Sequence, residues 1–181
     1  MEPNQILRFL PENFRHAAGD ARGSMAALLG VMDELQAPDE TIIERFDDYI
    51  SPYRAPDDFV MLQASWLGLD RYFDWSGGRP GAGRPVYRAG ISQLRLLVAE
   101  AAELLRQRGR TATLLRFLEV ATGIRGFRIA EGPAEGQRPF HFTLQAPFEA
   151  HPLEQLVTRI VDGERPAHAT YTIEFAPAAS P

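Results

Sequence analysis

The sequence lacks two residue types on which much protein chemistry depends. Cysteine is absent from all 181 positions, so this chain holds no disulfide, catalytic thiol, iron–sulfur cluster or cysteine-containing zinc site. Lysine is absent as well, because all 19 basic residues are arginine. A Schiff-base lysine, a pyridoxal phosphate lysine and the lysine of a Walker A loop are therefore excluded.

Long apolar runs and an excess of positive charge are missing too. The longest apolar run covers residues 25–32, well short of the roughly 18 residues that span a bilayer. Residues 1–4 carry no basic segment that leads into an apolar one, as a signal peptide would. The net charge is −5, whereas binding to phosphates needs a basic face. We therefore expect a cytoplasmic protein with no membrane insertion and no nucleic-acid partner.

What is present is the composition of a globular protein, with 45% hydrophobic and 24% charged residues. The length corresponds to one or two domains. A chain of this size buries roughly 70% of the surface that its unfolded form exposes. The sequence can therefore build a hydrophobic core without disulfides or metals.

The N-terminal part shows the pattern of a helical bundle or coiled coil between residues 25 and 50. Apolar residues recur every seven positions in two rows, as the a and d positions of such a seam do. Pro38 interrupts the pattern, because proline removes a helical hydrogen bond. The sequence predicts either one kinked helix or two helices, the second beginning at Pro38. The rows are Leu28, Leu35, Ile42 and Tyr49, and Met25, Met32, Asp39 and Phe46.

Three further helices are expected before residue 124. One begins after Pro56 with two aspartates, carries Phe59, Leu62 and Trp66 on one face, and ends near Gly68. A glycine- and proline-rich loop at 74–85 separates it from a helix over 85–108. A third helix runs from Thr111 to Gly123. The helix over 85–108 has apolar rows of Tyr87, Leu94 and Ala101, and of Ile91, Val98 and Leu105.

The hydrophobic period changes after Gly123. Residues 124–130, 139–145 and 169–175 alternate as strands do, and residues 151–162 form a short helix between the last two. We therefore predict an α+β fold, with an N-terminal helical bundle followed by a small β-β-α-β module. The predicted regions are a lead-in at 1–23, a helical region at 24–123, the α+β module at 124–176 and a flexible tail at 177–181.

No arrangement of residues predicts a catalytic, cofactor or metal site. The four histidines (His16, His141, His151 and His168) lack the spacing of a zinc helix, and Ser92 lies inside a predicted helix. Residues 77–83 lack the lysine of a phosphate-binding loop and are interpreted as a flexible connection. The carboxylate pairs are interpreted as helix-dipole partners or solvated faces, and the arginines as a basic helix–helix turn. The pairs are Asp47/Asp48, Asp57/Asp58, Glu100/Glu103 and Glu131/Glu135, and the arginines are Arg106, Arg108, Arg110 and Arg116.

Aromatic residues are concentrated in one stretch, with eight of the 18 lying between Phe46 and Trp75. Part of this set belongs to the core. Aromatic residues are also enriched at protein interfaces, so the concentration is equally consistent with burial against a partner. Composition alone does not separate the two interpretations.

Several short segments occur in a characteristic order along the chain. They are Leu10-Pro11-Glu12-Asn13-Phe14, Phe46-Asp47-Asp48-Tyr49-Ile50-Ser51-Pro52, Ala55-Pro56-Asp57-Asp58-Phe59, Ala64-Ser65-Trp66-Leu67-Gly68-Leu69, Ala102-Glu103-Leu104-Leu105-Arg106-Gln107-Arg108-Gly109-Arg110-Thr111, Leu118-Glu119-Val120-Ala121-Thr122-Gly123, Pro139-Phe140-His141-Phe142 and Arg165-Pro166-Ala167-His168-Ala169-Thr170-Tyr171. In this order, from about Leu10 to Phe175, the chain resembles the phage tail protein family related to tail protein I.

The resemblance implies a structural role without catalytic residues. Members of this family are baseplate wedge subunits of contractile phage tails and of phage-tail-like contractile injection systems. The expected partners are a larger wedge protein, reached through a helical bundle, and other hub and sheath-proximal components of a multi-copy assembly. The expected interface residues lie on the two long helices and the aromatic stretch: Leu28, Met32, Leu35, Ile42, Phe46, Tyr49, Trp66, Tyr87, Ile91, Leu94, Val98 and Leu105. The alternatives are a cytoplasmic helical adaptor and a wall-degrading hydrolase.

Overall fold

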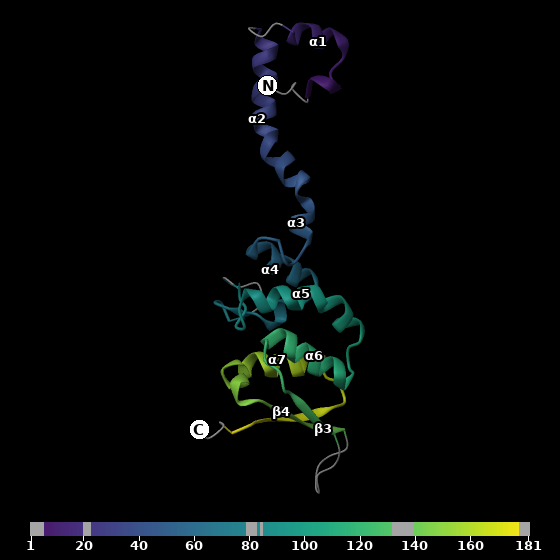
Figure 1. Cartoon of the computed structure of the whole chain (residues 1–181), viewed down its shortest axis with the longest axis vertical. Coiled ribbons are helices and arrows are strands. Elements are labelled where there is room, and N and C mark those ends of the chain that lie inside the picture. The colour runs from purple at the N-terminus through teal and green to yellow at the C-terminus, as the bar shows by residue number, and fades with distance from the viewer. Residues whose placement is uncertain (1–5, 20–22, 79–82, 84, 132–139, 178–181) are drawn as a thin grey trace. The chain divides into compact units, whose positions relative to one another are not determined.

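The computed structural model describes residues 6–19, 23–78, 83, 85–131 and 140–177, and it confirms the predicted α+β class. The chain divides into two compact units, Met1–Asp48 and Tyr49–Pro181. The described part of the first unit is helical, and the second unit contains both sheets (Figure 1). The predicted tail at 177–181 lies outside the described residues except for Pro177.

The first unit is built around one long helix, α2 (Ser24–Glu44), preceded by η1 (Ile6–Phe9) and α1 (Glu12–Ala18). Pro38 lies inside α2, so the single-helix alternative is confirmed and the second helix does not begin at Pro38. The turn after the proline gains a bond from the Thr41 hydroxyl, which donates to the carbonyl of Ala37 at 2.9 Å. The helix ends at Glu44 and is capped by Arg45, and the short α3 (Phe46–Ile50) leads into the second unit.

The second unit contains four longer helices and a mixed sheet. Its helices are α4 (Asp57–Trp66), α5 (Ile91–Arg106), α6 (Thr111–Thr122) and α7 (Glu154–Glu164), with η2 (Asp70–Tyr72) and η3 (Phe148–Leu153) between them. The sheet has the order β3 (Arg128–Glu131), β4 (His141–Ala146) and β5 (Thr170–Phe175), with β3/β4 antiparallel and β4/β5 parallel. The predicted β-β-α-β order is therefore confirmed.

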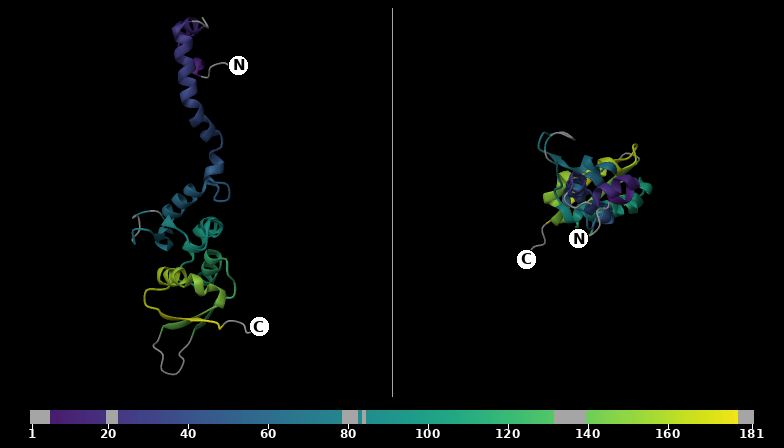
Figure 2. Two further views of the ribbon diagram at one scale, coloured as in Figure 1. Left: turned by 90° about the vertical axis from the view of Figure 1, so that its left-hand side faces the viewer. Right: turned by 90° about the horizontal axis from the view of Figure 1, so that it is seen from above.

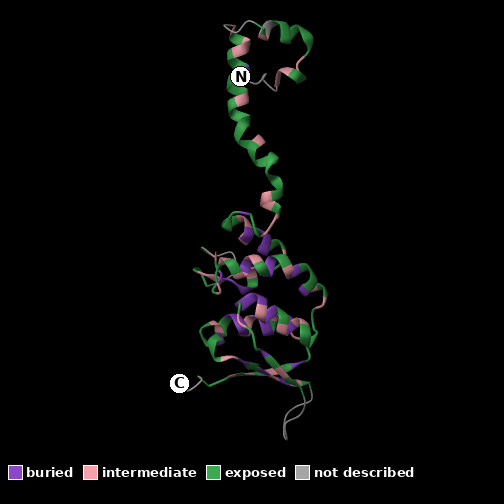
Figure 3. Ribbon diagram, in the orientation of Figure 1, coloured by how far each residue is buried: buried purple, intermediate pink, exposed green. Residues whose placement is uncertain are grey.

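The elements of this unit form three layers. Figure 1 shows α6 and α7 side by side between α5 and the sheet, and the side view in Figure 2 shows the same order. One continuous core joins the layers, because β4 directs Phe142 and Leu144 toward the helices while α5 and α6 contribute Leu97 and Leu118. Figure 3 shows the buried residues concentrated there. The compact units thus divide at Asp48, whereas the boundary predicted after residue 123 passes through a shared core.

The segment before α5 differs from its prediction. The helix expected from residue 85 begins at Ile91. Gly90, directly before it, has φ +88°, which lies outside the right-handed helical region, so the helix cannot extend back through this residue. Pro85–Val86 (β2) pairs instead with Asp74–Trp75 (β1), so the glycine-rich loop is flanked by a short antiparallel hairpin. Likewise, β3 begins at Arg128 rather than at residue 124, after Gly126 at φ +100°.

Candidate functional site

The most conspicuous surface of the first unit is an apolar stripe along α2. Its side chains are 37–72% exposed, whereas Leu29, at 4%, is the only buried residue described in this helix. Spacings of three and four residues place these side chains on one face of the helix. The apolar stripe consists of Leu28, Val31, Met32, Leu35, Ile42 and Ile43.

One polar residue lies within this face. Asp39 follows Leu35 by four positions and precedes Ile42 by three, and its side chain is exposed. A single polar residue in an apolar helical seam fixes the register and the partner at a cost in stability. Complete burial of a large apolar side chain contributes about 1.5–3 kcal/mol, and these side chains, at 37–72% exposure, have roughly half of that still to gain. The exposed apolar side chains therefore favour pairing with another helix, and Asp39 favours one register of that pairing.

A ladder of aromatic rings follows at the start of the second unit. Phe59 contacts Tyr49 and Trp66 edge to face, with ring centroids 5.7 and 5.8 Å apart. The Gln63 side chain fixes the preceding turn, because its Nε2 donates to the carbonyls of Tyr49 and Ile50 at 2.7 and 3.1 Å. Trp66 remains 67% exposed, so this ladder ends in a large apolar surface.

The predicted interface residues fall into three groups. The exposed ones are Leu28, Met32, Leu35, Ile42, Phe46 and Trp66, and the partly buried ones are Tyr49, Ile91 and Leu105. Tyr87, Leu94 and Val98 are 0–7% exposed and belong to the core of the second unit. Tyr87 lies outside α5, and its hydroxyl donates to the Ala121 carbonyl at 2.9 Å. These three residues contact the chain's own helices, so the interface prediction is corrected to exclude them.

Two polar clusters that the sequence analysis did not identify lie in the second unit. The first surrounds Glu164, which is 4% exposed. Its carboxylate accepts from Arg71 at 2.7 Å and from the Tyr72 hydroxyl at 2.5 Å, and Arg108 lies 3.3 Å away. Burial, followed by the bond to Glu164, raises the pKa of Tyr72 above its ordinary value. The cluster fastens the end of α7 to η2 and to the turn between α5 and α6.

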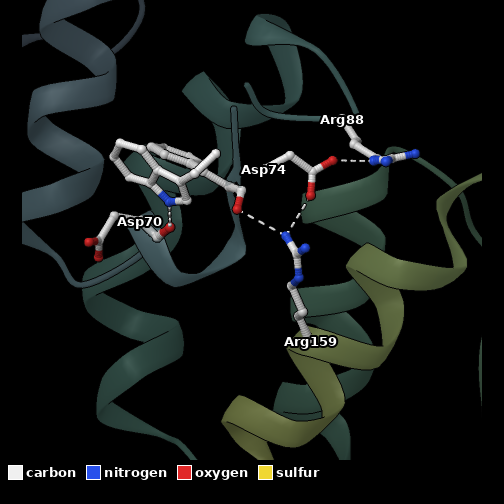
Figure 4. A network of polar contacts seen from close by, with 6 residues as sticks. Asp70, Asp74, Arg88 and Arg159 are labelled. Atoms are coloured by element: carbon white, nitrogen blue, oxygen red, sulfur yellow. Dashed lines mark hydrogen bonds and ion pairs between the residues drawn. The ribbon is translucent and has the colours of Figure 1, made fainter. Parts of the chain in front are cut away.

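The second cluster surrounds Asp74 (Figure 4). Arg159 Nη1 donates to Asp74 Oδ1 at 2.7 Å and to the Phe73 carbonyl at 2.9 Å, while Arg88 Nε donates to Asp74 Oδ2. Partial burial raises the pKa of Asp74, but the bonds from Arg88 and Arg159 outweigh it and lower the pKa below its ordinary value. These residues are far apart in the sequence, so spacing held no signal that could have found them.

A cavity of about 510 Å³ lies between the start of α6 and the helix-facing side of the sheet. Leu114, Ile129 and Phe142 form its apolar wall. Phe140 stands at its mouth with φ +63°, an uncommon conformation for a bulky side chain, and packs edge to face on His168. Glu131, Glu164, His141 and His168 also line the cavity, and among the contacts described for them none joins a carboxylate to a histidine.

Several of the carboxylates that the sequence analysis considered for catalysis have partners within the chain. Glu100 pairs with Arg116 at 2.6 Å, Glu103 with Arg106 at 2.7 Å and Asp57 with Arg95 at 2.5 Å. Glu135 lies outside the described residues. Both ring nitrogens of His141 lie within 3.1 Å of threonine hydroxyls on β5. In the described ranges, no group of three or more histidine, aspartate or glutamate residues has the geometry to hold a metal ion.

Across the part of the chain that the structure describes, every helix is too short or too polar to cross a bilayer. Comparison with known proteins gives no match, either to a protein-family model or to a curated protein sequence. The surfaces of the chain itself are therefore the guide to its function, and the family resemblance stays a prediction.

Proposed function

We propose that the chain is a structural baseplate wedge subunit of a contractile phage tail-like particle. In this role the apolar stripe of α2 joins a helix of a larger wedge protein, and the second unit is the folded body that the helix connects to the assembly. Two observations support the proposal. The short sequence segments follow the order found in the phage tail protein family, and the first unit leaves the apolar stripe exposed.

The exposure of the apolar stripe carries the proposal. A helix of 21 residues with one buried side chain draws little stability from its own unit, because most helical stability in proteins comes from the packing of an apolar face. A partner helix would supply that packing. Asp39 would then need a polar or basic group opposite it, which would select one register over its neighbours.

The test is a pull-down of the tagged full chain from its native lysate, with the eluate imaged by negative-stain electron microscopy. The informative variant is Leu35→Asp with Ile42→Asp, which places two charges in the stripe. The matched control is Gly30→Asp with Ala37→Asp, which places two charges at exposed positions on the opposite face of α2.

We expect sheathed particles or a co-purified larger wedge protein with the natural sequence and with the control. We expect neither with the stripe variant, because a charge buried without a partner costs several kcal/mol. A folded stripe variant that retains full association would overturn the helix-pairing proposal. A single soluble partner without particles would instead support the adaptor function.

A further inference from the structure

A polar cavity of about 420 Å³ opens on the second unit beside the β1–β2 hairpin. Its charged lining is formed by Arg71, Arg88, Arg159 and Asp74, and Trp75 adds an aromatic wall. Figure 4 shows Asp74 between Arg88, which follows β2 in the chain, and Arg159, which projects from α7.

The cavity carries more positive than negative charge. Asp74 is shared by Arg88 and Arg159, so one carboxylate faces two guanidinium groups. Arg71 is compensated separately by Glu164. One positive charge is therefore left over here, although the whole chain has a net charge of −5.

The two guanidinium groups also retain hydrogen-bond donors. A guanidinium has five N–H donors. The contacts described for Arg88 use Nε, and those for Arg159 use Nη1. Both side chains are 40–46% exposed, so their remaining donors can be reached from the solvent. The planar fork of arginine matches a carboxylate, which it binds through two parallel hydrogen bonds.

We propose that this cavity is a second binding site, which takes the carboxylate side chains of an acidic peptide segment of a partner protein. The lining favours a peptide because arginine and tryptophan are the residue types that dominate binding energy at protein interfaces. The site shares no residue with the apolar stripe, so it stands independently of the function proposed above.

The probe is a synthetic hexaglutamate peptide, titrated into the ¹⁵N-labelled full chain at low salt. The readout is the indole N–H resonance of each of the two tryptophans. Trp75 lines the cavity and donates from Nε1 to the Asp70 carbonyl at 3.2 Å, whereas Trp66 lies on α4 and is absent from the cavity lining. We expect a saturable shift of the Trp75 resonance and none of the Trp66 resonance.

Three variants test the roles of the cluster. Arg88→Gln and Arg159→Gln should each weaken binding about tenfold or more, because each removes a charge-assisted hydrogen bond. Asp74→Asn should strengthen binding, because it removes the carboxylate that competes with the peptide. The matched control is Arg106→Gln, which removes the same charge from an exposed arginine on α5. Thermal melts confirm that each variant is folded at the temperature of the titration.

Several outcomes would overturn the proposal. The absence of a saturable Trp75 shift would show that the site does not take acidic peptides. Equal weakening by Arg106→Gln would reduce the binding to general charge attraction. Inorganic phosphate that binds as tightly as the peptide would assign the cavity to a small anion instead of a protein segment.

Discussion

At the scale of single residues, Glu164 shows how a buried charge joins distant parts of a chain. Its carboxylate is contacted by side chains from η2 and from the turn after α5, more than 50 positions away in the sequence. Arg71 and Arg108 are partly exposed, whereas Tyr72 and the carboxylate are buried. The geometry therefore depends on a full set of partners, because a buried charge that loses them is strongly destabilising.

We expect Glu164→Ala to lower the free energy of unfolding by about 1–3 kcal/mol, because the buried Tyr72 hydroxyl loses its acceptor while Arg71 stays in contact with solvent. Glu164→Gln should cost less, since an amide oxygen still accepts hydrogen bonds. Urea denaturation followed by circular dichroism measures both. Glu149→Ala, at an exposed glutamate in η3, is the control and should change stability by no more than about 0.5 kcal/mol. A small effect of Glu164→Ala would contradict the assigned role.

At the scale of the elements, two helical glycines have opposite surroundings. A Cβ at Gly163, in α7, would lie 2.6 Å from the Tyr72 hydroxyl, which is fixed by its bond to Glu164. A Cβ at Gly30, in α2, would meet nothing within 4 Å. The same substitution should therefore have opposite effects in the two helices.

Gly163→Ala is expected to destabilise the second unit by about 1–3 kcal/mol through overpacking. Gly30→Ala is expected to stabilise α2 by up to about 1 kcal/mol, because alanine restricts the unfolded chain and favours a helix. Thermal unfolding monitored at 222 nm compares the two variants directly. Destabilisation by Gly30→Ala would mean that this face of α2 is covered.

The elements also show what the sequence could predict. Seven-residue spacing correctly indicated helices through Leu35 and through Leu94, and alternation indicated the strand that carries Phe142. The same spacing placed Leu94 at an interface, although it is buried in the core, while Leu35 is 72% exposed. Periodicity identifies an apolar face but holds no information about which surface covers it. The cluster of Asp74, Arg88 and Arg159 depends entirely on tertiary contacts, so local patterns could not reveal it.

At the scale of the whole molecule, the core belongs to the second unit. Its members run from Ala55 to Ala169, and none comes from the described part of the first 48 residues. Gln63 further ties Tyr49 and Ile50 to this unit through their carbonyls. We therefore expect the second unit to fold without the first.

A variant that lacks residues 1–48 should unfold in one cooperative transition, with a midpoint within a few degrees of the corresponding transition of the full chain. Differential scanning calorimetry measures both. A longer deletion of residues 1–66 also removes α4, including the fully buried Val60 and Ala64, and should abolish the transition. Loss of cooperative unfolding in the shorter variant would show that the first unit supports the second.

The position of α6 between two layers limits which substitutions evolution can accept in this helix. This helix is covered by α5 on one side and by the sheet on the other, so six of its residues are buried. A neutral substitution there must satisfy two neighbouring layers at once, whereas most side chains of α2 are exposed. Related sequences should therefore diverge slowly in α6 and quickly on the exposed faces of α2, and the function proposed above adds that the apolar stripe should stay apolar.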